Sequence, residues 1–562
     1  MTSPVSSTSP DFPVAWRHPA EEKLLWCHDQ AHYPDQITPL EYSLIGEVVT
    51  AGLVKAVRAY GIPFTIYDRH INGYVYLAIE WHAPQAPESP AQVQETSAKL
   101  NGAMADLQTS WDATWLPEIK QHLAWWAVFD RATAEMTTLQ QHLAETLRRW
   151  ERLWEIHFLL IVPSTFAMSE FVDLYTDLFE DADRFAPYKL LSGFPSKTLE
   201  STQQLWALSR RILASPAALQ VFLENEAGDV IGRLTSCAEC APIATELAQY
   251  LALHGERADR LNLYHPYWVE DPTPVINSLR NYIQQPSQNL LAEMQEVARQ
   301  RELHTSKFQA DVQHYPKSLR DRALFLLRAA QAGAFLSAEH GYWIDYKVGY
   351  RLRQVLLTIG ERIEAAGLLV EKDDLFYLYL DELQELLATN SPTAQFSAEC
   401  RGQITVRKEQ AERFTRVSPP TFLGTVPAEP AHHAADPITE MFRKWEGEVP
   451  APTDTSNVIV GSAGSPGIVR GTVKVVHQLS EATKVQPGDI LVADTTAPPW
   501  TSLFATVGGL VTNSGGVLSH AAVVAREYGI PAVVGASMAT QRLHDGQRVE
   551  VNGTRGTVLI LE

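Results

Sequence analysis

The spacing of apolar residues predicts helices over most of the chain. Between residues 94 and 388, apolar side chains recur at intervals of three and four, which is the period of one helical face. One such face contains Leu139, His142, Leu143, Thr146, Leu147, Trp150, Leu153 and Trp154. Prolines such as Pro163 divide the region into several helices, and no fixed period relates them, so a solenoid is not expected. We therefore expect a large, mostly helical domain over residues 16–390.

The pattern changes near residue 458. Residues 458–562 are rich in valine and glycine, and short apolar runs alternate there with turns, which predicts short strands and one helix. Residues 391–457 contain frequent Pro, Ala, Thr and Ser, as in a linker with a helix or two inside it. The expected fold class is multidomain, α plus α/β: a helical domain, a linker, and a small β-rich α/β domain.

Shorter signals mark the N-terminal region. Residues 1–15 are expected to form a disordered tail, because the segment opens on a Ser/Pro-rich stretch. Thr38 before Pro39 predicts the start of a helix, with threonine as the cap and proline in the first turn. Asn72-Gly73 is flanked by alternating apolar residues and predicts a β-hairpin.

Composition excludes several classes of protein. Of the 562 residues, 66 are acidic and 46 basic, so a net charge of −20 argues against nucleic acid as a partner. Apolar runs are broken before the ~20 residues that a membrane span needs. The N-terminus lacks the basic start and apolar stretch of a signal peptide. We therefore expect a cytoplasmic protein that does not bind a membrane.

The sequence contains one closely spaced pair of cysteines. Cys237 and Cys240 have the spacing of a redox or zinc pair, but no second pair or suitable histidine pair accompanies them. We expect two reduced thiols in the core.

The strongest chemical signal surrounds His520. An apolar run over residues 508–512 predicts a strand, Gly515 and Gly516 a sharp turn, and Ser519 the cap of a short helix that Gly529 ends. His520 is then on the first helical turn, where backbone N–H groups and the helix dipole favour an anion. An imidazole is a competent phosphoryl acceptor. We expect His520 to become phosphorylated.

Residues 512–535 resemble the phosphohistidine swivelling domain of the dikinase family, which includes phosphoenolpyruvate synthase, pyruvate phosphate dikinase, rifampin phosphotransferase and phenylphosphate synthase. The resemblance implies that Thr512, Gly515, Gly516 and Ser519 support the histidine loop. Residues 495–501 look like the loop near the histidine in this family, but Ala497 stands where an aspartate is usual. We expect Thr512 or Ser519 to orient the imidazole instead.

A second constellation lies in residues 337–353. On an α-helix, His340, Trp343, Lys347 and Arg351 share one face at spacings of three and four. Two cations could hold phosphoryl oxygens there, and the imidazole could take a proton from an acceptor hydroxyl. Glu339 and Asp345 could orient these groups. The alternative is a half-buried helix with salt bridges. The string resembles a motif of phenylphosphate synthase-like proteins, which favours the functional interpretation.

The source of the phosphoryl group is expected outside this chain. No glycine-rich nucleotide loop with an attendant lysine is present. We expect ATP and Mg²⁺ to bind a separate ATP-grasp-type subunit, with no cofactor held permanently on this chain and its metal ligands left open.

The primary hypothesis is the histidine-bearing subunit of a two-component phosphotransferase. It would convert a small aromatic alcohol such as phenol or an alkylphenol into an aryl phosphate, with release of AMP and phosphate. The alternatives are a rifampin phosphotransferase-like enzyme for a large hydroxylated antibiotic, and a non-catalytic phosphocarrier.

Overall fold

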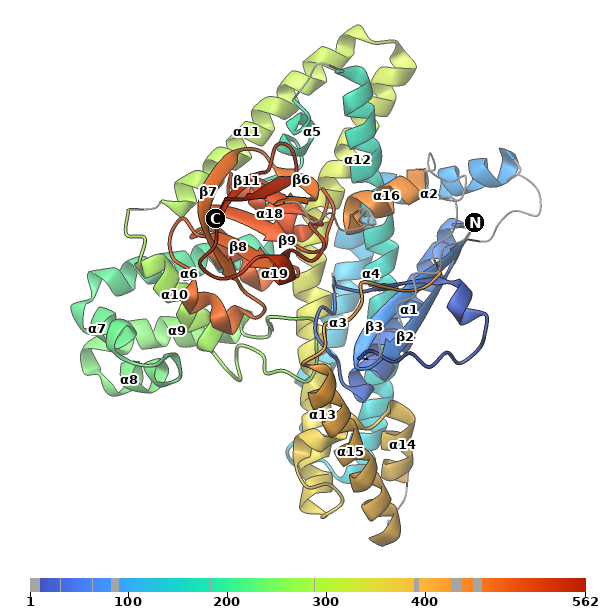
Figure 1. The fold of residues 1–562 in the computed structure, drawn as a ribbon, viewed down its shortest axis with the longest axis vertical. Helices are drawn as coiled ribbons and strands as arrows, with labels where there is room; N and C mark the ends of the chain where they lie inside the picture. The colour runs from blue at the N-terminus through green and yellow to red at the C-terminus, as the bar shows by residue number, and fades with distance from the viewer. Residues whose placement is uncertain are drawn as a thin grey trace. The chain divides into compact units, whose positions relative to one another are not determined.

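The computed structural model describes residues 11–30, 32–62, 64–81, 90–180, 183–287, 289–388, 394–425, 437–447 and 457–561 (Figure 1). The chain forms two compact units, each assembled from separate segments. The first comprises Met1–Pro163, Leu261–His265 and Trp343–Ala434, and the second comprises Ser164–Arg260, Pro266–Tyr342 and Ala435–Glu562. The two divisions at residues 163 and 342 fall inside unbroken helical stretches, so the chain passes from one unit to the other within a helix.

The first unit combines helices with a small antiparallel sheet. Its helices are α1 (Pro39–Tyr60), α2 (Pro90–Ser110), α3 (Leu116–Ala127), the first part of α4 (Met136–Leu178), α13 (Lys347–Ala365), α14 (Leu380–Ala388) and α15 (Ala394–Phe414). The strands are β1 (Leu25–His28), β2 (Phe64–Ile71), β3 (Tyr74–Trp81) and β4 (Phe422–Gly424), in the order β2-β3-β1-β4.

Both local predictions in this unit are confirmed. Thr38 caps α1, and its side chain and that of Glu41 form a reciprocal capping box, with Pro39 in the first turn. β2 and β3 form a hairpin in which Ile71 pairs with Tyr74. The two turn residues, Asn72 and Gly73, both have positive φ, at 53° and 91°. This is the turn that matches the twist of a hairpin.

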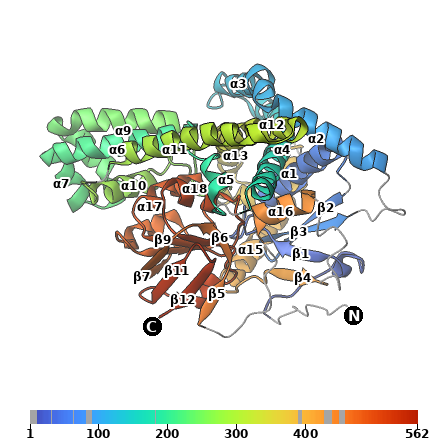
Figure 2. The ribbon, with the colours of Figure 1, turned by 90° about the horizontal axis from the view of Figure 1, so that it is seen from above.

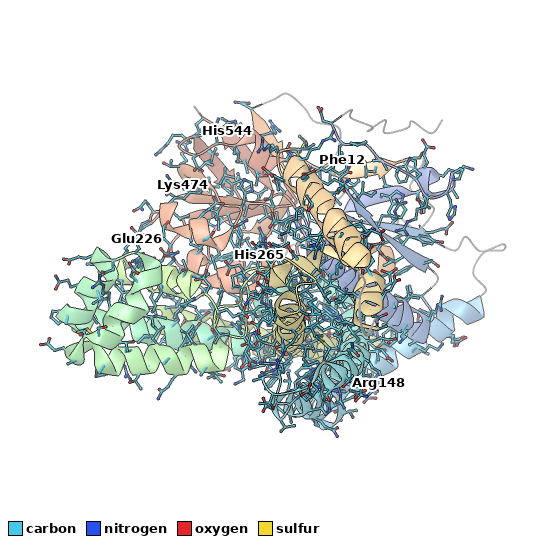
Figure 3. All side chains as sticks on the ribbon, turned by 90° about the horizontal axis from the view of Figure 1, so that it is seen from below. Phe12, Arg148, Glu226, His265, Lys474 and His544 are labelled. Atoms are coloured by element: carbon cyan, nitrogen blue, oxygen red, sulfur yellow. A yellow bond between two sulfur atoms is a disulfide. The ribbon has the colours of Figure 1, made fainter. Side chains whose placement is uncertain are left out.

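The N-terminal and linker predictions need correction. Phe12, labelled in Figure 3, lies within the expected tail but is only 1% exposed and packs among Tyr74, Tyr76 and Phe414. One large aromatic side chain thus anchors a segment whose composition suggested disorder. Within the expected linker, α15 and β4 belong to the first unit, and β4 pairs with β1. Residues 1–10, 426–436 and 448–456 lie outside the described residues.

The second unit contains a helical region and the C-terminal domain. Its further helices are α5 (Ala186–Lys189), α6 (Lys197–Ala214), α7 (Pro216–Glu224), α8 (Val230–Ser236), α9 (Ala241–His254), α10 (Thr273–Ile283), α11 (Leu290–Asp311), α12 (Lys317–Gly341), α16 (Pro437–Glu446), α17 (Thr501–Phe504), α18 (His520–Glu527) and α19 (Ala539–Arg542). The strands are β5 (Val458–Val460), β6 (Ser462–Ser465), β7 (Ile468–Val475), β8 (Ile490–Ala493), β9 (Gly509–Thr512), β10 (Ala532–Val534), β11 (Arg548–Asn552) and β12 (Thr557–Ile560).

The C-terminal strands form one mixed sheet, as the valine-rich pattern predicted. The order is β5-β12-β11-β7-β8-β9-β10-β6, and the central pairs from β7 to β10 are parallel. Alternate residues of these strands face two cores. Leu491 packs on the side of α17 and α18, whereas Ile490 and Val492 pack with Val549 of β11. Figure 2 shows α17 and α18 on one side of this sheet. The domain is therefore α/β, with α17 and α18 on one face of the sheet.

Helix α4 runs through Pro163, which the sequence pattern had suggested as a break. By length and composition alone it is the one helix in the described part of the chain that could cross a membrane. However, 61% of its most apolar window is buried inside the protein, as in a core helix. The same burial explains why the helix continues through a proline, because packing on its sides offsets one lost backbone hydrogen bond.

The expectation of two reduced thiols is corrected as well. Cys237 and Cys240 form a disulfide, with their Cα atoms 5.2 Å apart. The short 3-10 turn Ala238–Cys240 folds the chain back just before α9 and brings the two side chains together.

Candidate functional site

The histidine motif folds as its sequence predicts. β9 ends at Thr512, the glycine loop follows, and α18 begins at His520 with Ser519 in the capping position. Gly515 has a φ of 100°, which an L side chain rarely adopts. α18 ends at Glu527, and Gly529 has a φ of 64°, as expected of a glycine that follows a helix. His520 is thus fixed at the first position of the helix.

The His520 ring is half-buried and contacts two neighbours in its own domain. Its Nδ1 lies 3.4 Å from Oγ1 of Thr496, and the ring of Phe504 meets it edge-on with centroids 6.5 Å apart. Burial lowers the pKa of His520 to about 4, although a hydrogen bond to the backbone of Thr496 acts in the opposite direction. The imidazole is therefore neutral at physiological pH, which is the form that can act as a nucleophile.

The group beside the imidazole differs from the one expected. Thr512 Oγ1 donates a hydrogen bond to the carbonyl of Ser514 at 2.8 Å and so stabilises the loop itself. Ser519 occupies the cap position, but its hydroxyl makes no capping hydrogen bond. The hydroxyl next to the ring belongs to Thr496. Sequence reasoning missed Thr496, although it directly precedes Ala497, the position at which the family's aspartate is absent.

The backbone amides of the glycine loop are used differently from the prediction. They were expected to converge on an anion. Instead, the amide of Gly516 donates to the carbonyl of Trp445 and the amide of Leu518 to the carbonyl of Lys444, both at 2.8 Å. The amide of Ser519 donates to the carbonyl of Gly516 at 3.1 Å. Carbonyls at the end of α16 thus bind loop amides that were expected to face an anion.

Helix α16 is also fixed to α4 by a buried lysine. Lys444 is 7% exposed, and its Nζ donates to Oγ of Ser169 at 3.1 Å and to Oδ1 of Asp173 at 2.5 Å. The ammonium thus receives two polar partners from one helix. α16 therefore connects the histidine loop to the helical region of the second unit.

The carboxylate of Asp494 holds the glycine loop in place through hydrogen bonds. Its Oδ1 accepts from Asn513 Nδ2 at 2.7 Å and from the Thr540 hydroxyl at 2.9 Å, and its Oδ2 lies 2.8 Å from His477 Nδ1. Burial would raise the pKa of Asp494, but the hydrogen bonds and the His477 charge lower it overall. The carboxylate therefore stays ionised and holds Asn513, which begins the glycine loop.

The last turn of α18 binds the helical region. Arg526 donates to the carbonyls of Gly464 and Val517 and stacks on the ring of Tyr188, with 4.2 Å between the guanidinium carbon and the ring centroid. Glu527 accepts from the amide of Gly193 at 3.0 Å. Burial lowers the pKa of Arg526 to about 10 and raises that of Glu527. Two adjacent residues of the histidine motif therefore dock its domain.

The second constellation is not a single α-helical face. α12 passes through a π-helical turn, Tyr342–Tyr346, before α13 begins. A π turn needs more residues than an α turn, so it rotates the residues after it relative to His340. Within this turn, Trp343 lies against Lys120 of α3, with 5.3 Å from Nζ to the ring centroid. The regular α-helix on which the predicted alignment of His340 with Trp343, Lys347 and Arg351 depends is therefore not formed over the whole segment.

The remaining predicted residues of this segment have separate surroundings. Lys347 and Arg351 are half-buried, and the Arg351 guanidinium lies 5.5 Å from the centroid of the Tyr350 ring. Glu339 is 8% exposed, and its Oε2 accepts from the backbone amide of Lys197 at 2.8 Å. Glu339 therefore stabilises the start of α6, which is a structural role that the sequence did not indicate.

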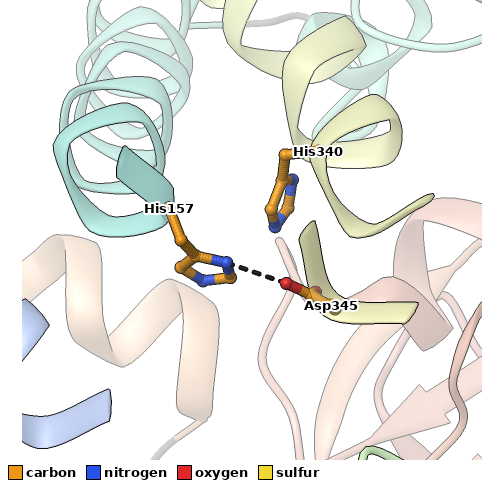
Figure 4. Close-up of side chains that lie close together, drawn as sticks. All are labelled: His157, His340 and Asp345. Atoms are coloured by element: carbon orange, nitrogen blue, oxygen red, sulfur yellow. Dashed lines mark hydrogen bonds and ion pairs between the residues drawn. The ribbon is translucent and has the colours of Figure 1, made fainter. Parts of the chain in front are cut away.

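The π turn instead aligns residues five apart. His340 and Asp345 have this spacing, and Oδ1 of Asp345 is 3.0 Å from Nδ1 of His157 in α4 (Figure 4). Nδ1 of His340 donates to the carbonyl of Leu336 at 2.9 Å, which leaves the lone pair on Nε2. His157 was missed because its partner is almost two hundred residues away.

Comparison with known proteins finds a family match for two regions of the chain. Residues 485–556 match the family described as "PEP-utilising enzyme, mobile domain", and residues 157–337 match "Rifampicin phosphotransferase fourth domain". The first match contains His520, and the second contains most of the helical region of the second unit. These matches support the PEP-utilising, dikinase-type family and not the narrower resemblance to phenylphosphate synthase.

Individual relatives agree with the family. The chain is 42% identical over its whole length to 14% of chondramide synthase cmdD from Chondromyces crocatus. It is 28% identical, over 95% of its length, to 62% of the uncharacterized phosphotransferase YvkC from Bacillus subtilis. It is 30% identical, over 66% of its length, to 40% of rifampicin phosphotransferase from Streptomyces sviceus. The chain therefore spans less than two thirds of each of these relatives.

Proposed function

We propose that the chain is part of a phosphotransferase. It carries a phosphoryl group on His520 and passes this group to a hydroxyl group of an organic acceptor. The observation that carries the proposal is the position of His520. It is a neutral, half-buried imidazole at the start of α18, inside the segment that matches a mobile domain of PEP-utilising enzymes. The names of the relatives, several of which are phosphotransferases, support the same reaction class.

The proposed chemistry takes place in two steps. A ring nitrogen of His520 attacks the phosphorus of the donor, a P–N bond forms, and the donor's P–O bond breaks with the electron pair on the leaving oxygen. The acceptor oxygen then attacks the same phosphorus, a P–O bond forms and the P–N bond breaks. The hydroxyl proton goes to a base, for which His340 is the proposed residue, since its Nε2 carries a lone pair. Positioning and electrostatics account for most of such catalysis.

The proposed donor is ATP with Mg²⁺, bound at an ATP-grasp-type site outside these 562 residues. That site would belong to a separate subunit or to another part of a longer polypeptide. In the overall reaction ATP, the acceptor and water would give the phosphorylated acceptor, AMP and phosphate, because water takes the phosphoryl group that the acceptor does not receive.

The acceptor class separates two hypotheses. Phenol or an alkylphenol was expected from the resemblance of residues 337–353. A larger hydroxylated natural product fits the relatives better, because they include a rifampicin phosphotransferase and a chondramide synthase. We therefore propose a hydroxylated natural product as the acceptor and retain simple phenols as the second candidate.

The experiment begins with chemical phosphorylation of the purified chain by phosphoramidate, which requires no nucleotide site. Mass spectrometry should find the phosphoryl group on His520, and His520→Ala should remove it. The labelled protein is then mixed with phenol, an alkylphenol or a rifamycin. Transfer to the rifamycin supports the proposal, and transfer only to phenols supports the second candidate. Label that reaches no acceptor indicates a phosphocarrier, and label absent from His520 refutes both hypotheses.

A further inference from the structure

We propose that the Cys237–Cys240 disulfide is a redox-active site that exchanges with dithiols, and that an external thiol attacks the sulfur of Cys237. The disulfide closes the short 3-10 turn Ala238–Cys240 between α8 and α9. All of these elements belong to the second unit. The proposal concerns the helical region alone and does not depend on the proposed phosphotransfer.

A cross-link over so few residues contributes little to stability. A disulfide stabilises a protein mainly by restricting its unfolded chain, and this effect grows with the length of the loop that it closes. Here only two residues separate the cysteines. Cys240 also packs in an apolar core contributed mainly by α6 to α10, which includes Phe222, Val230, Leu234, Ile243 and Leu247. We therefore expect this region to stay folded when the disulfide is reduced.

The two sulfurs differ in how easily a thiol from solvent can reach them. Cys240 is 0% exposed, whereas Cys237 is half-buried at the edge of the same core. The residues on either side of Cys237, Ser236 and Ala238, are both exposed. Attack by an external thiol is therefore expected at Cys237, which makes the sulfur of Cys240 the leaving group.

The leaving sulfur has a position that suits a negative charge. Cys240 directly precedes the first residue of α9, a helix of 14 residues. Backbone N–H groups and the helix dipole favour an anion at such a position, and a thiolate there is stabilised. A thiolate that is stabilised leaves a disulfide more readily. An accessible sulfur and a stabilised leaving sulfur are thus the two ends of one bond, and this combination defines the site.

Reduction takes two electrons and two protons, which a dithiol supplies. One thiolate of the dithiol attacks Sγ of Cys237, the bond to Cys240 breaks, and the electron pair goes to Sγ of Cys240. The second thiolate of the reductant then attacks its own sulfur in the mixed disulfide, and Cys237 leaves as a thiolate. The two protons lost by the reductant end on the two cysteines, and the reductant becomes a disulfide.

The spacing of the cysteines explains why the reductant should be a dithiol. In the mixed disulfide, the Cys240 thiolate remains close to Cys237, since their Cα atoms are 5.2 Å apart. It can therefore attack the mixed disulfide again and expel a monothiol, because such an intramolecular step is fast. A second thiol tethered within the reductant competes with this return step, whereas a monothiol has no such group.

The first test uses the full chain and measures the redox state of each cysteine by acid quenching, alkylation and mass spectrometry. Dithiothreitol should reduce Cys237 and Cys240 while circular dichroism stays unchanged. Glutathione at the same thiol concentration should reduce at least about tenfold less protein. Cys27 and Cys400, which are free, should be alkylated before and after treatment and serve as internal controls. Reduction only after unfolding, or equal reduction by both reagents, would overturn the proposal.

Reduced thioredoxin identifies the source of the dithiol. Reduction faster than with dithiothreitol at equal thiol concentration supports a protein dithiol as the natural reductant. A slower reaction supports a small dithiol. In either case exchange with a dithiol is established.

Single variants test which sulfur is attacked. In Cys240→Ser, the remaining Cys237 thiol should react with the neutral reagent 4,4′-dithiodipyridine at least about tenfold faster than Cys240 does in Cys237→Ser, because access limits the buried thiol. Mass spectrometry of the mixed disulfide separates these sites from Cys27 and Cys400. In urea the two variants should react at similar rates, which shows that the difference comes from the fold. Equal or reversed rates in the folded proteins refute attack at Cys237.

Discussion

The hydroxyl of Thr496 lies 3.4 Å from Nδ1 of His520, where the sequence of related proteins suggested a carboxylate. Thr496 is 4% exposed, so its side chain has little freedom to turn away. A neutral hydroxyl can orient a ring without adding charge. It therefore allows the imidazole to remain neutral and holds it in one position.

Removal of this hydroxyl should slow phosphorylation of His520. Thr496→Val keeps the shape of the side chain and loses one weak hydrogen bond, worth about 0.5–1.5 kcal/mol. The rate of labelling by phosphoramidate should therefore fall about two- to tenfold. Thr496→Ser retains the hydroxyl and should label at close to the wild-type rate. Equal rates in all three proteins would show that the threonine does not orient the ring.

Labelling of His520 by phosphoramidate should continue at a lower pH than labelling of an ordinary histidine. Because burial lowers the pKa of His520 to about 4, its ring stays neutral as the pH falls from 8 to about 5.5. A histidine in an unstructured peptide has a pKa near 6.5 and is only about a tenth neutral at that pH. With such a peptide in the same tube, the ratio of His520 label to peptide label should rise about tenfold. A constant ratio would mean that His520 titrates normally.

Loss of the buried Lys444 ammonium should loosen the histidine loop. Lys444→Met removes the contacts with Ser169 and Asp173, and hydrogen bonds to charged groups are worth about 1.5–3 kcal/mol. Hydrogen exchange at Gly516 and Leu518 should become faster, since α16 holds these amides. Lys317→Met is the control: Lys317 pairs with Asp321 but its side chain is 81% exposed. Such a surface pair contributes little, and exchange should not change.

A methyl group on Gly516 should push the glycine loop away from α16. A Cβ atom there would lie 2.3 Å from the carbonyl oxygen of Lys444, and backbone cannot move aside as easily as a side chain. Gly516→Ala should lower the free energy of unfolding by about 1–3 kcal/mol. Gly232→Ala, in α8, meets nothing within 4 Å and should raise it by about 0.5–1 kcal/mol. Denaturant unfolding measures both, and a harmless Gly516→Ala would show that α16 is not closely docked.

Sequence reasoning succeeded where the chemistry is contiguous. The strand, glycine turn and helix around His520 follow from residues that are neighbours in the chain, and each has a local physical reason. The same holds for the Thr38 cap and the Asn72-Gly73 hairpin. Local rules of this kind need no knowledge of the rest of the fold.

It failed where the arrangement depends on distant residues or on an irregular helix. The period of 3.6 residues placed His340 with Trp343 and Lys347, but a π turn at Tyr342–Tyr346 interrupts that period. His157 and Thr496 meet their partners only through tertiary packing. The linker prediction allowed for a helix or two, but it gave no sign that carbonyls of α16 bind the glycine loop.

The two carbonyls at the end of α16 also determine where the chain can be cut. A fragment that starts at Val458 would contain every strand of the C-terminal sheet. It would nevertheless leave the amides of Gly516 and Leu518 without the acceptors they have in the intact protein. An excised or transplanted histidine module should therefore begin before Pro437, so that it keeps the peptide groups that shape its own loop.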